Sequence, residues 1–288
     1  MKLPEHLVLS GGGIYGIHML KTLHCIENKI GFKLSMMKLK SISTASVGSL
    51  LGCAILLGYE MRELLDKIII NLDPKLCINF NLETIISDFG FCSQEYIEKH
   101  IKNMIDLKYP NRSETLTFRD LFEETQCTFY VSVTNLTHQK SELWSHITHP
   151  DVTILKALKI SCCIPFVFIP IFHNDEIYID GGILNNFPHD KVMEHRDKTL
   201  GITPYNECSN VNNVNNLEDY SSIILRLIYD RWSIFHTSLC NCNTSNTIFI
   251  KETVNPTDMA RLDSNDLYNI FIKYDVDLSQ LMFFSKKK

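Results

Sequence analysis

Residues 41–58, SISTASVGSLLGCAILLG, decide the fold because they predict a strand, a sharp turn and a helix in direct succession. β-Branched and small residues lead up to Ser46, Gly48 follows shortly after, and an apolar run with helical character comes next. Such a turn holds the serine hydroxyl at the tip of the strand. The first free N–H groups of the helix and its dipole favour a negative oxygen there. Ser46 is therefore a candidate nucleophile.

The turn matches the general pattern G-x-S-x-G incompletely. It reads Thr44-Ala45-Ser46-Val47-Gly48, so the downstream glycine is present and Thr44 replaces the upstream one. Small residues at these two positions let the strand and helix backbones come close. A second interpretation is a buried helix N-cap, in which the Ser46 hydroxyl only accepts an N–H bond from the following turn. The choice between the two depends on the rest of the chain.

A glycine-rich turn lies between a predicted strand at residues 6–9 and a predicted helix that begins near Gly16. The turn, residues 10–16, reads SGGGIYG. Without Cβ atoms, the N–H groups of Gly11, Gly12 and Gly13 can converge on an anion. That anion is either a phosphate or the oxyanion of an acyl-transfer intermediate. The phosphate interpretation is weaker, because the run is not G-x-G-x-x-G and no Lys-Ser/Thr pair follows it. A purely structural turn is a third interpretation.

Both turns belong to one predicted βαβ unit, since residues 34–43 lead into the strand before Ser46. Such a unit implies a parallel sheet and a right-handed crossover. The glycine turn and Ser46 then lie at the same edge of the sheet, which an oxyanion donor and a serine nucleophile require.

A third motif follows a predicted strand at residues 178–180. Asp180, Gly181 and Gly182 come at the strand's end, and Asn185 and Asn186 follow closely. An acid before two glycines indicates a demanding local geometry. Taken alone, a tight Asp-Gly turn explains it equally well.

The rest of the chain predicts further elements of an α/β protein. The expected helices cover residues 60–70, 93–105 with a capped start at Ser93, 117–124, 154–160, 220–240 and 264–282. The expected strands cover residues 128–136 with 142–145 beside it, a buried extended run at 166–171, 200–202 and 247–251. Residues 206–216 form an asparagine-rich loop that we expect to be mobile. His138, His146 and His149 are expected on the surface and not around a metal.

Composition bounds the class of protein. The chain has 288 residues, of which 45% are hydrophobic and 21% charged, as in an ordinary globular protein. It carries a net charge of -5 and clusters lysine only at residues 286–288, which argues against a general nucleic-acid binder. No repeat or low-complexity linker divides it, so we expect one domain over residues 1–288.

The cysteines and the apolar segments indicate a cytoplasmic protein. Ten cysteines in 288 residues are far less dense than the about 8–10% of a disulfide scaffold. The adjacent pair Cys162-Cys163 and the C-x-C at residues 240–242 do not form a zinc pattern, so we expect reduced thiols. No secretory signal is evident, and the apolar segments are shorter than the about 20 residues of a spanning helix. These features are compatible with peripheral contact with a membrane.

In this order and with these surroundings, the three motifs resemble the patatin-like phospholipase family. That family is known for a G-G-G-x-R/K-G oxyanion motif, a G-x-S-x-G elbow and a D-G-G/A motif usually followed by N-x-P. The matching segments here are residues 11–16, 44–48 and 180–182, with Asn186-Phe187-Pro188 behind them. Residues 157–165, ALKISCCIP, and residues 129–136 are similar to the family's connecting segments. The resemblance covers a core of about residues 5–190 and leaves 191–288 as a helical and strand extension.

The resemblance implies a three-layer α/β/α sandwich with a central, mainly parallel sheet. It also implies a metal-independent serine hydrolase of the phospholipase A type, which needs no cofactor and cleaves fatty-acyl esters of glycerolipids. Ser46 would attack the ester and Asp180 would accept its proton. The implied oxyanion and substrate-binding residues are Gly11, Gly12, Gly13 and Gly16, and the supporting residues are Thr44, Gly48, Gly181 and Gly182. Residues 59–105 or the helix from Tyr220 would supply an apolar surface for lipid contact.

Two departures from the family pattern keep other functions open. Tyr15 stands where the family has a basic residue, and Thr44 adds a methyl group at a crowded point. Both favour, as an alternative, a weak or inactive lipid-binding homologue. A nucleotide-binding α/β protein that uses the glycine turn is the third hypothesis.

Overall fold

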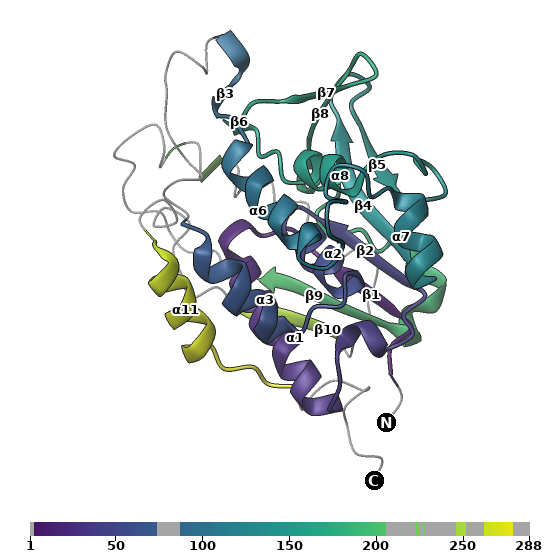
Figure 1. Ribbon diagram of the computed structural model, residues 1–288, viewed down its shortest axis with the longest axis vertical. Helices are drawn as coiled ribbons and strands as arrows, with labels where there is room; N and C mark the ends of the chain where they lie inside the picture. Colours follow the sequence, from purple (N-terminus) through teal and green to yellow (C-terminus); the bar gives the residue numbers. More distant parts are fainter. Residues whose placement is uncertain are drawn as a thin grey trace.

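A computed structural model describes residues 3–73, 87–205, 220, 223–224, 227, 246–251 and 262–278 of the chain, and these residues form a central mixed sheet with flanking helices (Figure 1). Among the described residues, the sheet has eight strands. In the series β10, β9, β1, β2, β4, β8, β7 each strand pairs with the next, and β5 pairs with β4 outside this series. The strands are β1 (His6–Leu9), β2 (Ser41–Ala45), β4 (Thr128–Asn135), β5 (Lys140–Trp144), β7 (Ile171–His173), β8 (Glu176–Asp180), β9 (Thr199–Tyr205) and β10 (Thr247–Lys251).

Most of the sheet is parallel, as the sequence predicts. The pairs β10 with β9, β9 with β1, β1 with β2 and β2 with β4 are parallel, and β5, β7 and β8 join as antiparallel strands. The register aligns Leu9 of β1 with Thr44 of β2. The glycine turn and Ser46 therefore leave the sheet at the same edge.

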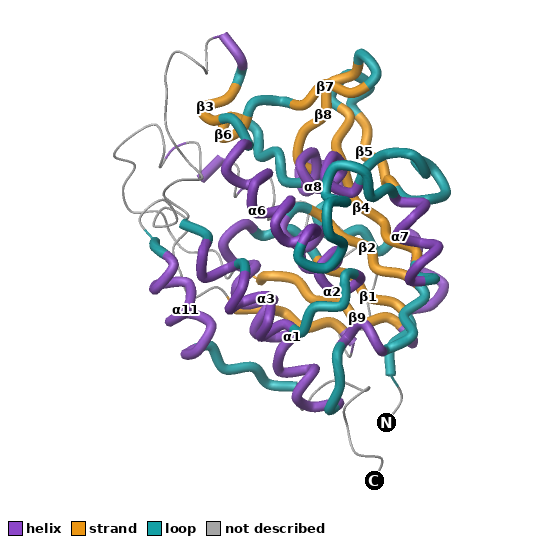
Figure 2. The backbone as a smooth tube through the Cα atoms, in the orientation of Figure 1, coloured by secondary structure: helices purple, strands orange, loops and turns teal. Residues whose placement is uncertain are grey.

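Helices flank this sheet (Figure 2). The α-helices among the described residues are α1 (Gly16–Ile30), α2 (Val47–Leu56), α3 (Met61–Lys67), α6 (Glu95–Asp106), α7 (Phe118–Thr125), α8 (Ile154–Ser161), α9 (Gly182–Asn185) and α11 (Ser264–Lys273). The 3₁₀ helices are η1 (Gly13–Tyr15), η2 (Leu34–Met36), η3 (Ile69–Asn71) and η4 (Asp190–Lys198). Helix α1 contacts α2, α3 and α11, α8 contacts α2 and α6, and α2 packs on β1, β2 and β4.

The two faces of β1 show how the layers are built. Leu7 and Leu9 point into the main core beneath α1 and α2, whereas Val8 packs with Phe187 and Val192 on the η4 side. This alternation is the period of a β-strand whose two faces are both covered. The expected sandwich of helices on a largely parallel sheet is confirmed.

Three expectations about single elements are wrong. Residues 166–171 are not one buried run, because β6 (Phe166–Phe168) pairs with β3 (Gly90–Cys92) in a separate two-stranded sheet and Phe166 is 51% exposed. The last predicted helix ends early, at Lys273. Helix α6 starts at Glu95 without a side-chain cap.

Of the three histidines expected on the surface, only His138 is exposed. His146 stacks on Phe122 and His149 stacks on Trp144, so both are partly covered. The predicted loop at residues 206–216 lies outside the described residues. Of the predicted helix 220–240, only residues 220, 223, 224 and 227 are described. In the part of the chain that the structure describes, no helix is long and apolar enough to span a bilayer.

His18 is a buried titratable group in the first helix. Its ring is 0% exposed and lies edge-on to Tyr274, with 4.5 Å between ring centroids. Burial lowers the pKa of His18 to about 4, because the charged imidazolium would lose its hydration. The folded protein therefore holds this histidine neutral at a pH where the unfolded chain protonates it.

We expect His18 to make the protein sensitive to mild acid. Its pKa is about 4 in the folded state and 6.5 for an ordinary histidine, so its contribution to stability is lost as the pH falls from 6.5 towards 4. Linkage puts that loss at roughly 2 kcal/mol at pH 5. Urea unfolding at pH 7.5 and pH 5 should show a smaller drop in unfolding free energy for His18→Gln than for the wild type. Equal drops would contradict this assignment.

Candidate active site

The candidate site forms where two strands meet end to end along one edge of β4. β5 pairs with residues 131–135 on one edge of β4, so β2 and β8, which pair with overlapping residues, must share the other edge. Ala45 at the end of β2 lies opposite Ser132, and Asp180 at the end of β8 lies opposite Val133. The register of β4 thus brings Ser46 and Asp180 together.

Ser46 and Asp180 make a direct hydrogen bond. The Ser46 hydroxyl donates to Oδ2 of Asp180 over 2.6 Å. Ser46 is 5% exposed and Asp180 is 0% exposed. A carboxylate that accepts a serine proton in a site with little water has the geometry of a general base beside a nucleophile.

The backbone of Ser46 has a conformation that serine rarely adopts. Its φ is 48° and its ψ is -128°, between the end of β2 and the first residue of α2. Such a conformation costs on the order of 1–3 kcal/mol and persists only where the surroundings impose it. The N-cap interpretation is not supported, because the Ser46 side chain makes no capping bond to α2.

Close backbone approaches fix this elbow against β1. A Cβ added at Gly48 would stand 2.5 Å from the carbonyl oxygens of both Leu9 and Ser10. A Cβ at Gly16 would stand 2.3 Å from a methyl carbon of Val47. Both glycines therefore let α2 and the start of α1 pack directly on the turn.

Asp180 is held from both sides. Its Oδ1 accepts the Gly182 N–H over 2.7 Å, and its own N–H donates to the Cys163 carbonyl over 2.8 Å. A Cβ at Gly181 would stand only 2.0 Å from the carbonyl oxygen of Ser132. Gly181 is thus the residue that lets the chain pass against β4, while Gly182 orients the carboxylate.

The three glycines of the first turn differ in what their amides do. Gly11 donates its N–H to the Asn186 carbonyl over 3.1 Å, and a Cβ on Gly11 would stand 3.0 Å from that of Ser46. Gly11 is therefore a spacer beside Ser46, which differs from the expected role of its amide as an oxyanion donor. Within the described residues, the N–H groups of Gly12 and Gly13 donate to no acceptor, and both glycines are half-buried.

Thr44 fits where the family pattern has glycine. Its hydroxyl donates to the Tyr130 carbonyl over 2.9 Å, and its methyl group fills the space over Gly52, where a Cβ would stand 2.7 Å away. The absent side chain of Gly52 compensates for the added side chain of Thr44. Tyr15, in place of the basic residue, is 5% exposed and tilted against His18.

Three side chains to which the sequence assigned no role at the site lie close to the pair. The Ser161 hydroxyl, at the end of α8, accepts the Ser46 N–H over 2.9 Å. The Cys162 thiol is within hydrogen-bond reach of the Ser46 hydroxyl. Asn186 has a buried side-chain oxygen without a hydrogen-bond partner, close to Gly11. The resemblance of residues 157–165 to a family segment was the one sequence signal that pointed to this helix end.

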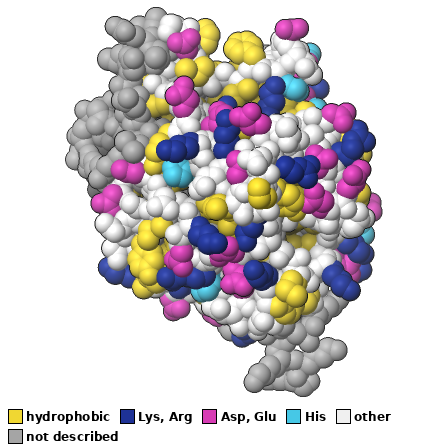
Figure 3. Space-filling view, in the orientation of Figure 1, with side chains coloured by type: hydrophobic (Ala, Val, Ile, Leu, Met, Phe, Trp, Pro, Cys, Tyr) yellow, Lys and Arg dark blue, Asp and Glu magenta, His cyan; other side chains and the backbone are white. Residues whose placement is uncertain are grey.

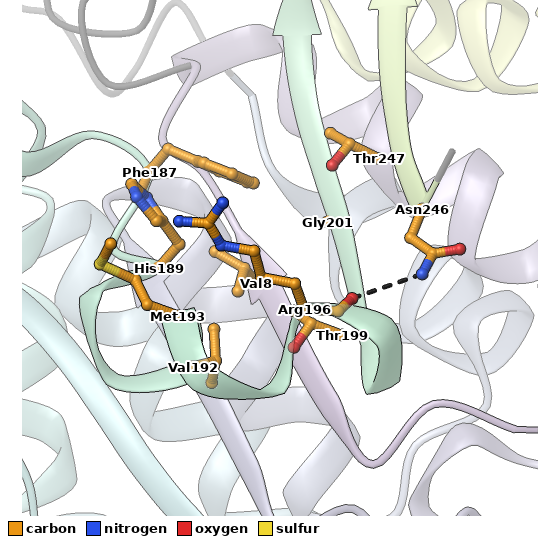
Figure 4. A pocket seen from close by; sticks show the side chains of 10 residues that line it. All are labelled: Val8, Phe187, His189, Val192, Met193, Arg196, Thr199, Gly201, Asn246 and Thr247. Atoms are coloured by element: carbon orange, nitrogen blue, oxygen red, sulfur yellow. Dashed lines mark hydrogen bonds between the residues drawn. The ribbon is translucent and has the colours of Figure 1, made fainter. Parts of the chain in front are cut away.

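A small pocket lies on the face of β1 that carries Val8, opposite to the main core. Its volume is about 40 Å³, and Phe187, Arg196 and Asn246 are among its lining residues (Figure 4). The Asn246 amide donates to the Arg196 carbonyl over 3.4 Å. Neither Ser46 nor Asp180 lines this pocket.

Across the described ranges, no three His, Cys, Asp or Glu side chains are grouped so that they could hold a metal ion.

Comparisons with known proteins agree with these motifs. A family model described as Patatin-like phospholipase matches residues 7–193. The chain is 34% identical over 202 residues to the Probable lipid hydrolase of Invertebrate iridescent virus 6, covering 68% of this chain and 66% of that protein. It is 29% identical over 226 residues to an uncharacterized protein of Acanthamoeba polyphaga mimivirus, covering 75% of this chain and 73% of the relative. The chain thus spans slightly less than two thirds of the first of these relatives.

Among solved structures, the fold is similar to that of VipD from Legionella pneumophila. The TM-score is 0.51 with 17% sequence identity, and the match covers 98% of this chain and 70% of that chain. At this identity the likeness concerns the fold alone.

We expect Gly181→Ala to separate Asp180 from Ser46. The new Cβ would overlap the Ser132 carbonyl, so β8 must move away from β4. Labelling of Ser46 by a fluorophosphonate should slow at least about tenfold, because a misplacement near 1 Å costs up to about 100-fold.

Gly31→Ala is the matched control. It lies in open space at a φ of 83°, so it should lower stability by about 1 kcal/mol without slowing the labelling. If Gly181→Ala is labelled as fast as Gly31→Ala, the close approach does not position Asp180.

Proposed function

We propose that this chain, which belongs to the patatin-like phospholipase family, hydrolyses fatty-acyl esters of glycerolipids with Ser46 as nucleophile and Asp180 as general base. Membership in a family of lipid hydrolases supports an esterase or lipase activity. The observation that carries the residue assignment is the 2.6 Å hydrogen bond from the Ser46 hydroxyl to the buried Asp180 carboxylate.

In the first half of the proposed reaction, the Ser46 oxygen attacks the ester carbonyl carbon and its proton passes to Oδ2 of Asp180. The carbonyl oxygen becomes an oxyanion. When the tetrahedral intermediate collapses, the bond to the leaving alcohol breaks and the alcohol takes the proton from Asp180. An acyl group then remains on Ser46.

In the second half, water attacks the acyl carbon and gives a proton to Asp180. The bond between the acyl carbon and the Ser46 oxygen breaks, Ser46 recovers its proton, and a fatty acid leaves. One carboxylate thus serves as base and acid in both halves, and the scheme needs no histidine and no metal ion.

The oxyanion needs N–H donors that are not already used. The amides of Gly11 and Ser46 donate to protein oxygens, so we assign this role to Gly12 and Gly13. Both lie in the turn that follows β1 and precedes α1. Removal of one such donor typically costs about 3 kcal/mol of transition-state stabilisation.

The proposed substrate is an acyl ester of a glycerolipid, and the proposed reaction is of the phospholipase A type. The chain spans slightly less than two thirds of the first relative. We propose that the whole protein has this activity. We also propose that residues 1–288 form one domain. The alternative of an inactive lipid-binding homologue is less favoured, because Thr44 is accommodated by Gly52 and leaves the bond between Ser46 and Asp180 in place.

Ser46→Ala and Asp180→Asn should each abolish fatty-acid release from phospholipid vesicles, by about 1000-fold or more, since the two groups act as a unit. The matched controls are Ser43→Ala, a buried serine of β2 without a hydrogen-bond partner, and Asp151→Asn, an exposed carboxylate. Both controls should keep the wild-type rate. Full activity in either dyad variant would overturn the assignment.

A lipid substrate implies contact with a lipid surface, and an apolar surface is exposed near the site. Phe89, Phe166 and Phe172 are 67%, 51% and 64% exposed, and Gly90 pairs with Phe166 across the small sheet of β3 and β6. Figure 3 shows hydrophobic side chains along the top of the molecule, where β3 and β6 lie in Figure 1. We propose that these phenylalanines contact the membrane. Phe89 falls within residues 59–105, one of the two regions expected from the sequence.

The protein should therefore co-sediment with phosphatidylcholine vesicles at low salt, and the double variant Phe89→Ser with Phe166→Ser should bind several-fold less. Each replacement removes a large apolar side chain from the contact. The control is Met36→Ser, which is equally exposed at 65% but precedes the opposite end of β2. No binding by the wild type, or an equal loss in the control, would contradict the membrane contact.

A further inference from the structure

Ser161 at the end of helix α8 and the two residues that follow it each contact one member of the proposed dyad. The Ser161 hydroxyl accepts the Ser46 N–H over 2.9 Å. The Cys162 thiol contacts the Ser46 hydroxyl, and the Cys163 carbonyl accepts the Asp180 N–H over 2.8 Å. One helix end thus contacts both the nucleophile and the base.

The hydrogen bonds of Ser161 use its full capacity. A serine hydroxyl has one proton to donate and two lone pairs. Ser161 donates to the Ser132 carbonyl over 2.8 Å, accepts the Ser46 N–H, and lies 3.0 Å from the Ser49 hydroxyl. Because its only proton goes to Ser132, Ser49 must be the donor in the last pair. Ser161 is 0% exposed, so these partners fix its orientation.

Ser161 links the elbow to the strand that also positions the base. Ser132 lies opposite Ala45 in the pairing of β4 with β2, and its hydroxyl is 3.3 Å from the Gly181 carbonyl. Ser161 donates to the carbonyl of this same Ser132. A short series of hydrogen bonds through Ser161 and Ser132 thus links the backbone of Ser46 to the segment that carries Asp180.

The elbow requires an acceptor at this point. Ser46 has a strained backbone, and a buried N–H without an acceptor would cost about a further 1–3 kcal/mol. Without Ser161, the peptide before Ser46 could rotate to relieve the strain, and the hydroxyl would then turn away from Asp180. The acceptor must come from a side chain because no backbone carbonyl of the described residues accepts this N–H.

We propose that Ser161 is a positioning residue, whose hydroxyl holds the backbone of Ser46 so that the nucleophile points at Asp180. This inference rests on the proposed function of Ser46. Ser161 touches Ser46 only through the main-chain N–H and does not contact the reacting oxygen. Its loss should lower the rate constant of the chemical step in folded molecules, and not the number of sites that react.

The neighbouring Cys162 does not compete with Ser46. Burial, and then the charge of Asp180, raise the pKa of the Cys162 thiol well above its usual range. The thiol stays protonated near neutral pH, so it is a poor nucleophile. Labelling of this site therefore reports on Ser46.

The test measures fluorophosphonate labelling of Ser161→Ala by intact mass and peptide mapping. The labelling rate constant should fall about 10- to 100-fold, as for other small misplacements of a reacting group, while the final labelled fraction equals the folded fraction. The matched control Ser43→Ala removes another fully buried hydroxyl, one that makes no hydrogen bond, and should keep the wild-type rate constant. Ser161→Thr retains the hydroxyl and should react faster than Ser161→Ala.

The rate constant belongs to the folded molecules, so it stays measurable if Ser161→Ala lowers the folded fraction. An unchanged rate constant with a reduced labelled fraction would mean a purely structural role and overturn the proposal. A Ser161→Thr variant that folds but reacts no faster than Ser161→Ala would also overturn it. If the wild type is not labelled at Ser46, the proposed function fails and the positioning role fails with it. A labelled wild type and an equally fast Ser161→Ala refute the positioning role alone.

Discussion

The structure depends on one register, that of β2 and β8 against the same edge of β4. Ala45 and Asp180 lie opposite the adjacent residues Ser132 and Val133, so two strands that approach from opposite directions end beside each other. The hydrogen bond between Ser46 and Asp180 is a consequence of this register. A shift by one residue would turn the Asp180 side chain to the other face of the sheet, because successive side chains alternate.

Much of this arrangement could be predicted from the sequence, because its causes are local. Glycines between an apolar strand and an apolar helix indicate a turn, and two such turns in one βαβ unit must leave a parallel sheet at the same edge. The predicted parallel core and the helix boundaries of α7 and α8 agree with the structure for the same reason, since capping and periodicity are short-range signals. The pairing of Ser46 with Asp180 across 134 residues is not a local signal, and it was expected only from the resemblance to the patatin-like family.

The remainder depends on contacts that only tertiary structure creates. Ser161 lies 115 residues from Ser46, and nothing in its local sequence distinguishes a serine that accepts a backbone N–H from one that ends a helix. The Gly11 amide is used by Asn186, a partner far along the chain. The apolar residues 166–171 indicate a buried strand, but β6 and β7 belong to two different sheets and Phe166 is exposed. The periodicity of a sequence cannot show which of its apolar residues are buried by another element of the fold.

The proposed reaction requires that Ser46 carries an acyl group during turnover. The most direct measurement is rapid acid quenching of the protein during its first turnover with a p-nitrophenyl acyl ester, followed by peptide mapping. One acyl group is expected on the peptide that contains Ser46, and none on that peptide in Asp180→Asn. Ester hydrolysis with no acylated peptide, or with the acyl group on another residue such as Cys162, would contradict the proposed reaction.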